Sequence, residues 1–425
     1  MFSFCGRLPE ISCVLIMGAL LAYNAEAQHR VPLTLAEAED LAMADEPGLL
    51  ALRARADAYE DQAVAAGQLP DPVLRVGIAN FPIESGGFST EGMTQAQLGI
   101  RQVFPRARSR ALQTERLRSM ASEQSEHAAA RSRDVLATAR QSWLETYYWQ
   151  SAEQIVSESR PFFDDLVTIT RSMYSVGRKT QHDVLRAELE LSRLDDRLIA
   201  AQRQRAAGQA ALSRWIGDDA YRPVAMKLPG WGNLPSLQVL RSGLEEHPLL
   251  AAADAGIEAQ QSAVDLANES YKPDWTLDFG YGYRDGALPN GEPRSDFVSL
   301  TVSVDLPFFS ENRQDRKLAA ALHERRVARE SKASLRAGLQ SELGSEYARW
   351  TELTKRVSLY EQQILGQSAG QAKAALLAYQ SDTGDFSDVM RGYIDDLNTR
   401  LEHIRLKVER ARSYAELANL GGLPR

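Results

Sequence analysis

The sequence contains the same pattern of prolines, tyrosine and aspartate twice, about 200 residues apart. The corresponding pairs are Pro47 and Pro248, Pro72 and Pro273, Pro105 and Pro307, Tyr174 and Tyr379, and Asp183 and Asp388. The offset is 201 residues at the first pair and 205 at the last. Self-similarity at a fixed period is expected when a chain contains two versions of one structural unit. We predict a first repeat at 28–215, a linker or small side domain at 216–236, and a second repeat at 237–425.

Residues 1–27 have the features of a secretory signal peptide. A positively charged start precedes ten apolar residues at 13–22, and Ala-Glu-Ala at 25–27 is a typical cleavage site. The alternative, a single anchoring helix, would need roughly 20 apolar residues. Both cysteines, Cys5 and Cys13, lie in this segment. The mature chain is therefore expected to have no disulfide and no thiolate site.

Composition and motifs argue against several functional classes. The chain is 44% hydrophobic and 25% charged, which is ordinary for a folded protein, and its net charge of -8 makes it a poor candidate for binding nucleic acid. The six histidines are scattered without an H-x-x-x-H spacing, and neither a P-loop nor a G-x-S-x-G motif is present. We expect no enzymatic activity, no cofactor and no metal site. An enzyme would require a site assembled from distant residues.

Four segments alternate apolar and polar residues with a period of two, which is the pattern of β-strands. Their apolar positions are Leu74, Val76, Ile78; Ala96, Leu98, Ile100; Trp275, Leu277, Phe279, Tyr281, Tyr283; and Val298, Leu300, Val302, Val304, Leu306. We predict one β-hairpin at about 73–104 and another at about 274–306. A small sheet covered on one side is one interpretation, and a membrane barrel is the other. Because about eight strands are the minimum for closure, a barrel would need several chains.

Two stretches of about 70 residues, 106–174 and 308–379, contain few helix-breaking signals. A helix of that length would extend roughly 100 Å, several times the thickness of a bilayer core. We expect Pro161 to kink or break the first one. Shorter helices are predicted at about Leu35–Gly67 and Leu237–Asn268.

Apolar residues in the helical regions recur at steps of three and four. The clearest series are Leu339, Leu343, Tyr347, Trp350, Leu353, Val357, Tyr360, Ile364; Val184, Ala187, Leu191, Leu194, Leu198, Ala201; and Ile394, Leu397, Leu401, Ile404, Val408, Ala411, Ala415. Sustained heptad spacing predicts helices that pack side by side in a left-handed supercoil. An isolated coiled-coil rod would not explain the two hairpins.

The order of half-helix, hairpin, long helix, turn and half-helix, present twice behind a signal peptide, resembles the TolC-type outer-membrane efflux factors. The most specific match is Tyr174–Leu185, with a weaker copy at Tyr379–Met390. The resemblance implies a mainly α-helical homotrimer in the cell outer membrane of a Gram-negative bacterium. Its four strands per chain would form a 12-stranded β-barrel, continued into the periplasm by an α-helical coiled-coil barrel.

The resemblance also implies a passive exit duct. Its partners would be outer-membrane lipid, a periplasmic adaptor protein and a proton-driven inner-membrane pump. The stretch Met93–Pro105, following Asn80–Pro82, is similar to members that serve heavy-metal cation efflux. A multidrug or type I secretion duct of the same family is the alternative, and a periplasmic coiled-coil adaptor is the alternative from another class.

The resemblance assigns roles to the turns at 174–183 and 379–388, which would be the periplasmic tips of the helical hairpins. Adaptor contacts would involve Val176, Gly177, Arg178 and Gly384, and the gate would involve Tyr379, Asp183, Asp388, Asp382 and Asp385. Within this set, Tyr379 and Asp183 match a hydrogen-bonded pair that holds the tip shut, and Asp388 matches an acidic ring.

Three positions depart from the family pattern. Asp382 replaces a glycine, Gly384 replaces an arginine that can complete the closing link, and Arg391 replaces a second acidic residue. The gate is therefore expected to be built differently in this chain.

The residues of the turns also support predictions that do not depend on the resemblance. Gly177 is placed as a C-cap glycine, and Thr180 is placed to cap the helix that follows. Asp183 and Asp388 could be ordinary first-turn acids, favoured by the helix dipole. Alternatively, a ring of such acids around an axis would attract cations.

Overall fold

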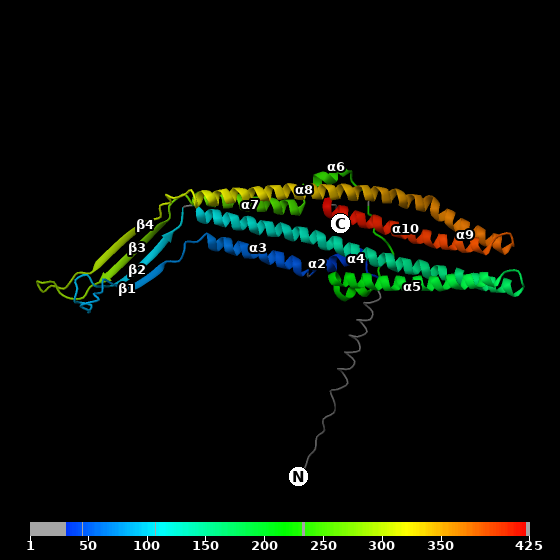
Figure 1. Cartoon of the computed structure of the whole chain (residues 1–425), viewed down its shortest axis with the longest axis horizontal. Coiled ribbons are helices and arrows are strands. Elements are labelled where there is room, and N and C mark those ends of the chain that lie inside the picture. The colour runs from blue at the N-terminus through cyan, green and yellow to red at the C-terminus, as the bar shows by residue number, and fades with distance from the viewer. Residues whose placement is uncertain (1–30, 45, 107, 232–233, 422–425) are drawn as a thin grey trace, which may run out of the picture. The chain divides into compact units, whose positions relative to one another are not determined.

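The computed structural model describes residues 31–44, 46–106, 108–231 and 234–421, so the predicted signal peptide lies outside the described residues. The helices are α2 (Leu35–Ala44), α3 (Pro47–Ala66), α4 (Ser109–Ser175), α5 (Gln181–Ile216), η1 (Gly217–Tyr221), α6 (Leu237–Leu244), α7 (Pro248–Glu269), α8 (Gln314–Leu359), η2 (Tyr360–Ile364), α9 (Leu365–Gln380) and α10 (Phe386–Gly421). The strands are β1 (Val73–Ala79), β2 (Gln95–Phe104), β3 (Trp275–Tyr283) and β4 (Phe297–Val304) (Figure 1). None of the described helices is both long enough and apolar enough to cross a membrane.

The described residues form two compact units, and each unit takes segments from both sequence repeats. The sheet unit comprises Gly48–Ala130 and Pro248–Ala337. The helical unit comprises the described residues up to Pro47, Arg131–His247, and the described residues from Gly338 onward. All four strands therefore lie in the sheet unit, and both predicted tip turns lie in the helical unit.

The four strands form one antiparallel sheet in the order β1-β2-β3-β4, which confirms the prediction of four strands (Figure 1). The two repeats join where β2 pairs with β3, for example at Ile100 and Phe279. Within the hairpins, Val76 pairs with Leu98 and Phe279 with Leu300. This register aligns the predicted apolar positions within the four strands on one face, because neighbours across a sheet point to the same side.

Each of the two predicted half-length helices is divided in two at a proline. Pro47 is the first residue of α3 and Pro248 is the first residue of α7. Proline disfavours helical conformation in the residue before it but suits the first position of a helix, where no backbone N–H donor is needed. The expectation of single helices over Leu35–Gly67 and Leu237–Asn268 was wrong for this reason.

The long helix of the first repeat is continuous, whereas that of the second repeat is interrupted. α4 continues through Pro161, so of the two predicted outcomes, a kink or a break, the break does not occur. In the second repeat, the π-helical turn η2 separates α8 from α9. The repeat offset is 202 residues before Pro161 and 205 after it, so Pro161 corresponds to a position between 363 and 366, at the end of η2 or the start of α9. Proline and π-turns are both common causes of local bending in helices.

The segment between the repeats packs within the helical unit, of which it is a part. Val224 forms a parallel bridge with Leu33, and Trp143 donates its indole N–H to the Leu33 carbonyl oxygen at 3.1 Å. Trp231 stacks on Tyr414 with a centroid separation of 5.0 Å. Trp231 thus acts as a packing anchor.

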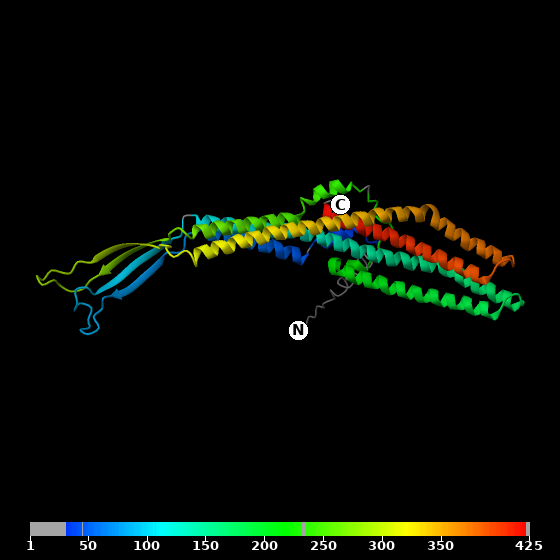
Figure 2. The same ribbon diagram turned by 45° about the horizontal axis from the view of Figure 1, so that its top comes forward.

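The helices of the helical unit form two antiparallel hairpins, α4 with α5 and α9 with α10 (Figure 2). Heptad positions from both hairpins, such as Leu194 and Leu397, belong to one buried cluster, which also contains Val389. Small residues allow close approach of the helices: a Cβ added to Gly392 would lie 3.0 Å from the Ala372 Cα. Larger side chains at such positions would force the helices of a hairpin apart.

We expect His247 to make the stability of the helical unit depend on pH. Burial, reinforced by the nearby Arg133 charge, lowers the pKa of His247 below its ordinary value of 6.5. The folded chain then binds fewer protons than the unfolded chain as the pH falls through 6.5 toward the folded pKa, and stability is lost over that interval. We expect the melting temperature, followed by circular dichroism in detergent, to drop between pH 7.5 and 5.5. The drop in melting temperature should be smaller in His247→Gln than in the wild type, and the exposed control His323→Gln should show the same drop as the wild type. Equal drops in all three proteins would contradict a role of His247 in the pH dependence.

Candidate gate at the two interhelical turns

The turns at 174–183 and 379–388, here called the first and second tip turns, share one backbone conformation. In the first, the N–H groups of Gly177 and Arg178 donate to the carbonyls of Tyr174 and Met173 at 2.9 and 3.0 Å. In the second, the N–H groups of Asp382 and Thr383 donate to the carbonyls of Tyr379 and Ala378 at 3.2 and 2.9 Å. All four pairs are related by the same offset of 205 residues.

Backbone geometry explains two departures from the family pattern in the second tip turn. Asp382 has φ 58°, and its counterpart Gly177 has φ 73°. Glycine adopts this left-handed conformation freely, and aspartate is among the few other residues that tolerate it. Gly384 packs so closely that an added Cβ would lie 2.9 Å from the Ala378 Cβ. An arginine at 384 would require the turn to move.

Thr180 and Asp183 form a complete capping box at the start of α5. The Asp183 carboxylate accepts hydrogen bonds from the Thr180 N–H at 3.1 Å and from the Thr180 hydroxyl at 2.9 Å. The predictions that Thr180 caps the helix and that Gly177 adopts a C-cap conformation are confirmed. Asp183 thus has the local capping role that was one of its two interpretations.

Tyr379 lies at the centre of the second tip turn with its side chain fully buried, although its counterpart Tyr174 is 48% exposed. Its ring packs edge-on against Phe386 at 5.8 Å. Burial, with smaller contributions from the Asp183 and Asp382 carboxylates, raises the pKa of the Tyr379 hydroxyl above 10. Tyr379 and Asp183 are therefore near each other, but the structure shows no hydrogen bond between them among the described residues.

Lys179 connects the two tip turns, although it is not among the gate residues predicted from the sequence. Its ammonium nitrogen lies 4.7 Å from the centre of the Tyr379 ring and 3.6 Å from an Asp382 carboxylate oxygen. The Lys179 side chain is only 16% exposed. At the offset of 205 residues, Lys179 corresponds to Gly384, the position where the resemblance implied an arginine. The repeat comparison could have identified it, because the missing cation of one turn is present in the other.

The remaining predicted gate residues are at the start of α10. Asp388 forms an ion pair with Arg391 at 3.7 Å, and both side chains are more than 60% exposed. Pairs that are this exposed contribute little to stability. Asp385 is exposed and precedes the first residue of α10, and its carbonyl oxygen accepts from the Asp388 N–H at 3.1 Å. Arg391 therefore offsets part of the acidic charge that Asp388 would bring to a ring.

The residues predicted to contact an adaptor lie on the surface of the first tip turn. Val176 is 68% exposed, and Gly177 and Arg178 are also exposed. Gly384, in the second turn, is only partly exposed. These accessibilities permit docking at the first turn, and the adaptor contact itself stays a prediction.

Two substitutions separate capping from gating at Asp183. Thr180→Ala and Asp183→Ala both remove the capping box and should destabilise the first tip turn by about 1 kcal/mol. If Asp183 also closes the gate, Asp183→Ala will give a larger closed-state conductance in planar bilayers than Thr180→Ala, and Tyr379→Phe will be leakier than wild type. Equal conductance in the two alanine variants would show that Asp183 acts only as a cap.

The sheet is a second candidate functional surface, because its apolar face is not covered by the rest of the described chain. Ten residues of this face are between 42 and 76% exposed; they are Leu74, Val76, Ile78, Leu98, Ile100, Phe279, Tyr281, Val298, Leu300 and Val302. The interpretation of a sheet covered on one side is therefore wrong for the described chain. Contiguous apolar surface of this kind marks a membrane or protein interface.

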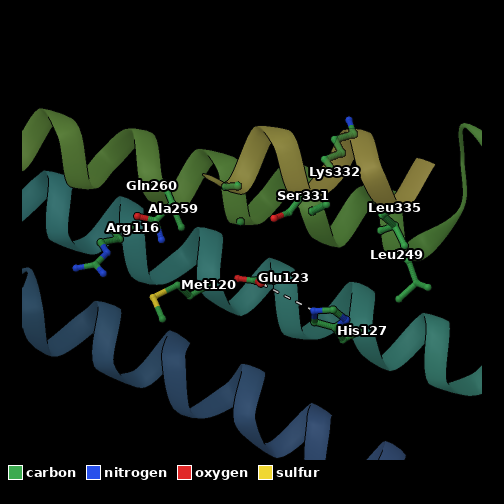
Figure 3. A pocket seen from close by; sticks show the side chains of 13 residues that line it. Arg116, Met120, Glu123, His127, Leu249, Ala259, Gln260, Ser331, Lys332 and Leu335 are labelled. Atoms are coloured by element: carbon green, nitrogen blue, oxygen red, sulfur yellow. Dashed lines mark ion pairs between the residues drawn. The ribbon is translucent and has the colours of Figure 1, made fainter. Parts of the chain in front are cut away.

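A hollow of about 440 Å³ lies between α4, α7 and α8 within the sheet unit. Figure 3 shows Glu123 directed toward His127, whose Nε2 lies 3.9 Å from a Glu123 carboxylate oxygen, while Lys332 points away. Lys332 pairs instead with Asp254. The polar groups that line the hollow do not converge on one point, so the hollow lacks the arrangement of a ligand site. Across the described residues, no group of three or more His, Asp or Glu side chains is placed to hold a metal ion.

Comparison with known proteins agrees with this architecture. Residues 239–423 match the family model described as outer membrane efflux protein. The chain is 25% identical over 414 residues to protein CyaE of Bordetella pertussis, covering 92% of this chain and 85% of that protein. It is 22% identical over 374 residues to the cobalt-zinc-cadmium resistance protein CzcC of Cupriavidus metallidurans, covering 84% and 82%. The crystal structure of CusC is similar with a TM-score of 0.77 at 15% identity, covering 92% of this chain and 93% of that one.

The fold and these relatives define a mainly α-helical outer-membrane channel protein with four antiparallel strands per chain. The chain belongs to the TolC-type outer membrane efflux protein family. Members of this family are not enzymes, and their helices extend from the outer membrane into the periplasm. Family membership excludes the alternative of a periplasmic coiled-coil adaptor.

Proposed function

We propose that three copies of this chain form a passive exit duct of a tripartite efflux system. The observation that carries the proposal is the sheet, which combines an exposed apolar face with two unpaired edges, β1 and β4. Unpaired edges cannot persist in a membrane, and four strands are too few to close a barrel. Three copies supply twelve strands. Because β1 and β4 run in opposite directions, β4 of one copy can pair antiparallel with β1 of the next.

In this duct the tip turns form the periplasmic gate. Support comes from Lys179, which holds the first tip turn against the second through the Tyr379 ring and the Asp382 carboxylate. Weakening this contact would free the α4–α5 hairpin from the α9–α10 hairpin. An adaptor that docks on Val176, Gly177 and Arg178 would act on the same turn.

The preferred substrates are heavy-metal cations, delivered by an adaptor and a proton-driven pump. The support is the similarity to a cobalt-zinc-cadmium resistance protein, together with the stretch Met93–Pro105. A duct needs no metal ligands of its own, since a partner selects the substrate. A multidrug or type I secretion duct is the alternative.

Gene deletion with complementation tests the substrate. We expect the deleted strain to become sensitive to cobalt, zinc or cadmium and to regain tolerance with the wild-type gene. A variant that inserts but cannot dock an adaptor, such as Val176→Asp, should not restore tolerance. Unchanged metal tolerance with lost drug or detergent tolerance would favour the multidrug alternative.

A further inference from the structure

We propose that Arg75, Arg101 and Asp278 form a positively charged ring inside the barrel, which makes this section of the duct admit anionic solutes more readily than cationic ones. The inference rests on the proposed trimeric duct and not on the substrate proposed for it: a local preference for anions slows the passage of metal cations through this section without preventing it. The positive charge of this ring is opposite in sign to that of the acidic ring predicted at the tip from Asp388.

These three side chains are the only charged residues within the bounds of the four strands. All three lie on the polar face: Arg75 is opposite Gly99 and Asp278 is opposite both Arg101 and Thr301. The apolar neighbours Leu74, Ile100 and Phe279 point to the other face. Strands of membrane barrels place apolar residues toward lipid and polar residues toward the lumen. The charges of the sheet are therefore gathered at one place on the lumenal side.

The geometry of the cluster leaves arginine as the group that solvent meets. One Asp278 carboxylate oxygen accepts from Arg101 Nε at 2.8 Å and from an Arg75 guanidinium nitrogen at 3.1 Å. The Asp278 side chain is 16% exposed, while those of Arg75 and Arg101 are 58% and 42% exposed. A single carboxylate neutralises only one of two guanidinium groups. Each chain thus contributes one uncompensated positive charge, with the negative charge covered by its partners.

The surroundings of the cluster are neutral and small, so nothing shields it. The polar-face neighbours are Gly77, Gln97, Gly99, Gly280, Ser299 and Thr301. A hollow of about 430 Å³ lies over this part of the sheet and includes Arg75 and Asp278 in its lining. At Gly99 an added Cβ would lie 2.9 Å from the Phe279 carbonyl oxygen, so the polar face cannot hold a larger side chain there.

Rings of arginine in pores favour anions, as acidic rings favour cations. At about 8 Å in water a unit charge changes the local concentration of a monovalent ion about twofold, and salt screens the effect beyond roughly 8–10 Å. The expected preference is therefore local and modest, on the order of threefold between an anion and a cation of similar size.

Thiol reactivity at the cluster tests the proposal. Both cysteines of the chain lie in the predicted signal peptide, so Thr301→Cys would provide a single reactive thiol directly opposite Asp278. Intact cells are treated with two methanethiosulfonates of similar size, one bearing a sulfonate and one a trimethylammonium group. The ratio of their rates, divided by the ratio for a free thiol, measures the sign of the local potential. The corrected ratio does not depend on whether the periplasmic tip is open, since the reagents enter the barrel from outside the cell.

We expect the corrected ratio to favour the anionic reagent about threefold, to rise with Asp278→Asn, to fall toward one with Arg75→Gln, and to fall below one with Arg75→Gln and Arg101→Gln combined, because that variant leaves only the Asp278 carboxylate. Arg75→Gln alone serves if the double variant is not assembled. Arg326→Gln, which removes an arginine that is 77% exposed on α8, should leave the ratio unchanged. A ratio near one that none of the cluster variants alters would overturn the charged ring while leaving the duct intact. Reaction at Leu300→Cys but not at Thr301→Cys would instead contradict the duct itself.

Discussion

Leu300→Lys should prevent assembly of the protein in the outer membrane. Leu300 is 67% exposed on the apolar face, opposite Phe279 in the middle of the sheet. A lysine at the bilayer midplane costs about 2–4 kcal/mol per chain, so three copies would lose roughly 6–12 kcal/mol. We expect the variant to be absent from the outer-membrane fraction and to be degraded, as measured by fractionation and immunoblotting.

Ser299→Lys is the matched control, because the neighbouring residue lies on the polar face. It adds the same charge one position away, toward water, and should assemble at nearly the wild-type level. Equal loss of both variants would mean that the strand tolerates no added charge at all. Normal assembly of Leu300→Lys would mean that the apolar face does not contact lipid.

Lys179→Met should make the closed duct leakier. The methionine keeps the length and apolar contacts of the side chain, but it removes the cation that lies over Tyr379 and pairs with Asp382. Asp382 is 61% exposed, so solvent weakens the ion pair and most of the effect should come from the partly buried cation–π contact. A loss of roughly 1 kcal/mol would raise the ratio of loosened to closed tips about fivefold. Single-channel conductance in planar bilayers measures this ratio directly.

Two variants serve as controls for Lys179→Met: one keeps the positive charge at 179, and the other removes the neighbouring positive charge. Lys179→Arg should retain the closed-state conductance, since guanidinium also binds aromatic faces and carboxylates. Arg178→Met removes an adjacent exposed cation for which the described part of the chain shows no ion pair, and it should leave conductance unchanged in the absence of an adaptor. If Arg178→Met and Lys179→Met leak equally, net charge rather than the specific contact closes the tip.

The sequence was sufficient for the main elements of the fold, because their signals are local and repeated. Period-two alternation located the strands, and the series containing Leu194 and Leu397 located buried helical faces. Local signals were also enough for the caps at Gly177 and Thr180. Prolines were harder to interpret, because one residue type had opposite effects. Pro47 and Pro248 start new helices, whereas Pro161 is accommodated inside α4.

The residues of the gate could not all be predicted from the sequence, because the gate depends on contacts between segments that are about 200 residues apart. Lys179 becomes significant only when the first tip turn lies against Tyr379. The same holds for the sheet, where Asp278 comes between Arg75 and Arg101 only after the two hairpins pair through β2 and β3. A single chain's sequence carries no direct record of such pairing, although the offset between the repeats indicates equivalent positions.

The number of chains in the detergent-extracted complex tests the central claim most directly, because one chain supplies only four strands and leaves β1 and β4 unpaired. Native mass spectrometry of the protein purified from outer membranes should give three times the mass of the mature chain. The complex should fall apart when β1 or β4 is disrupted. A predominant monomer that conducts ions in bilayers would contradict closure by three copies.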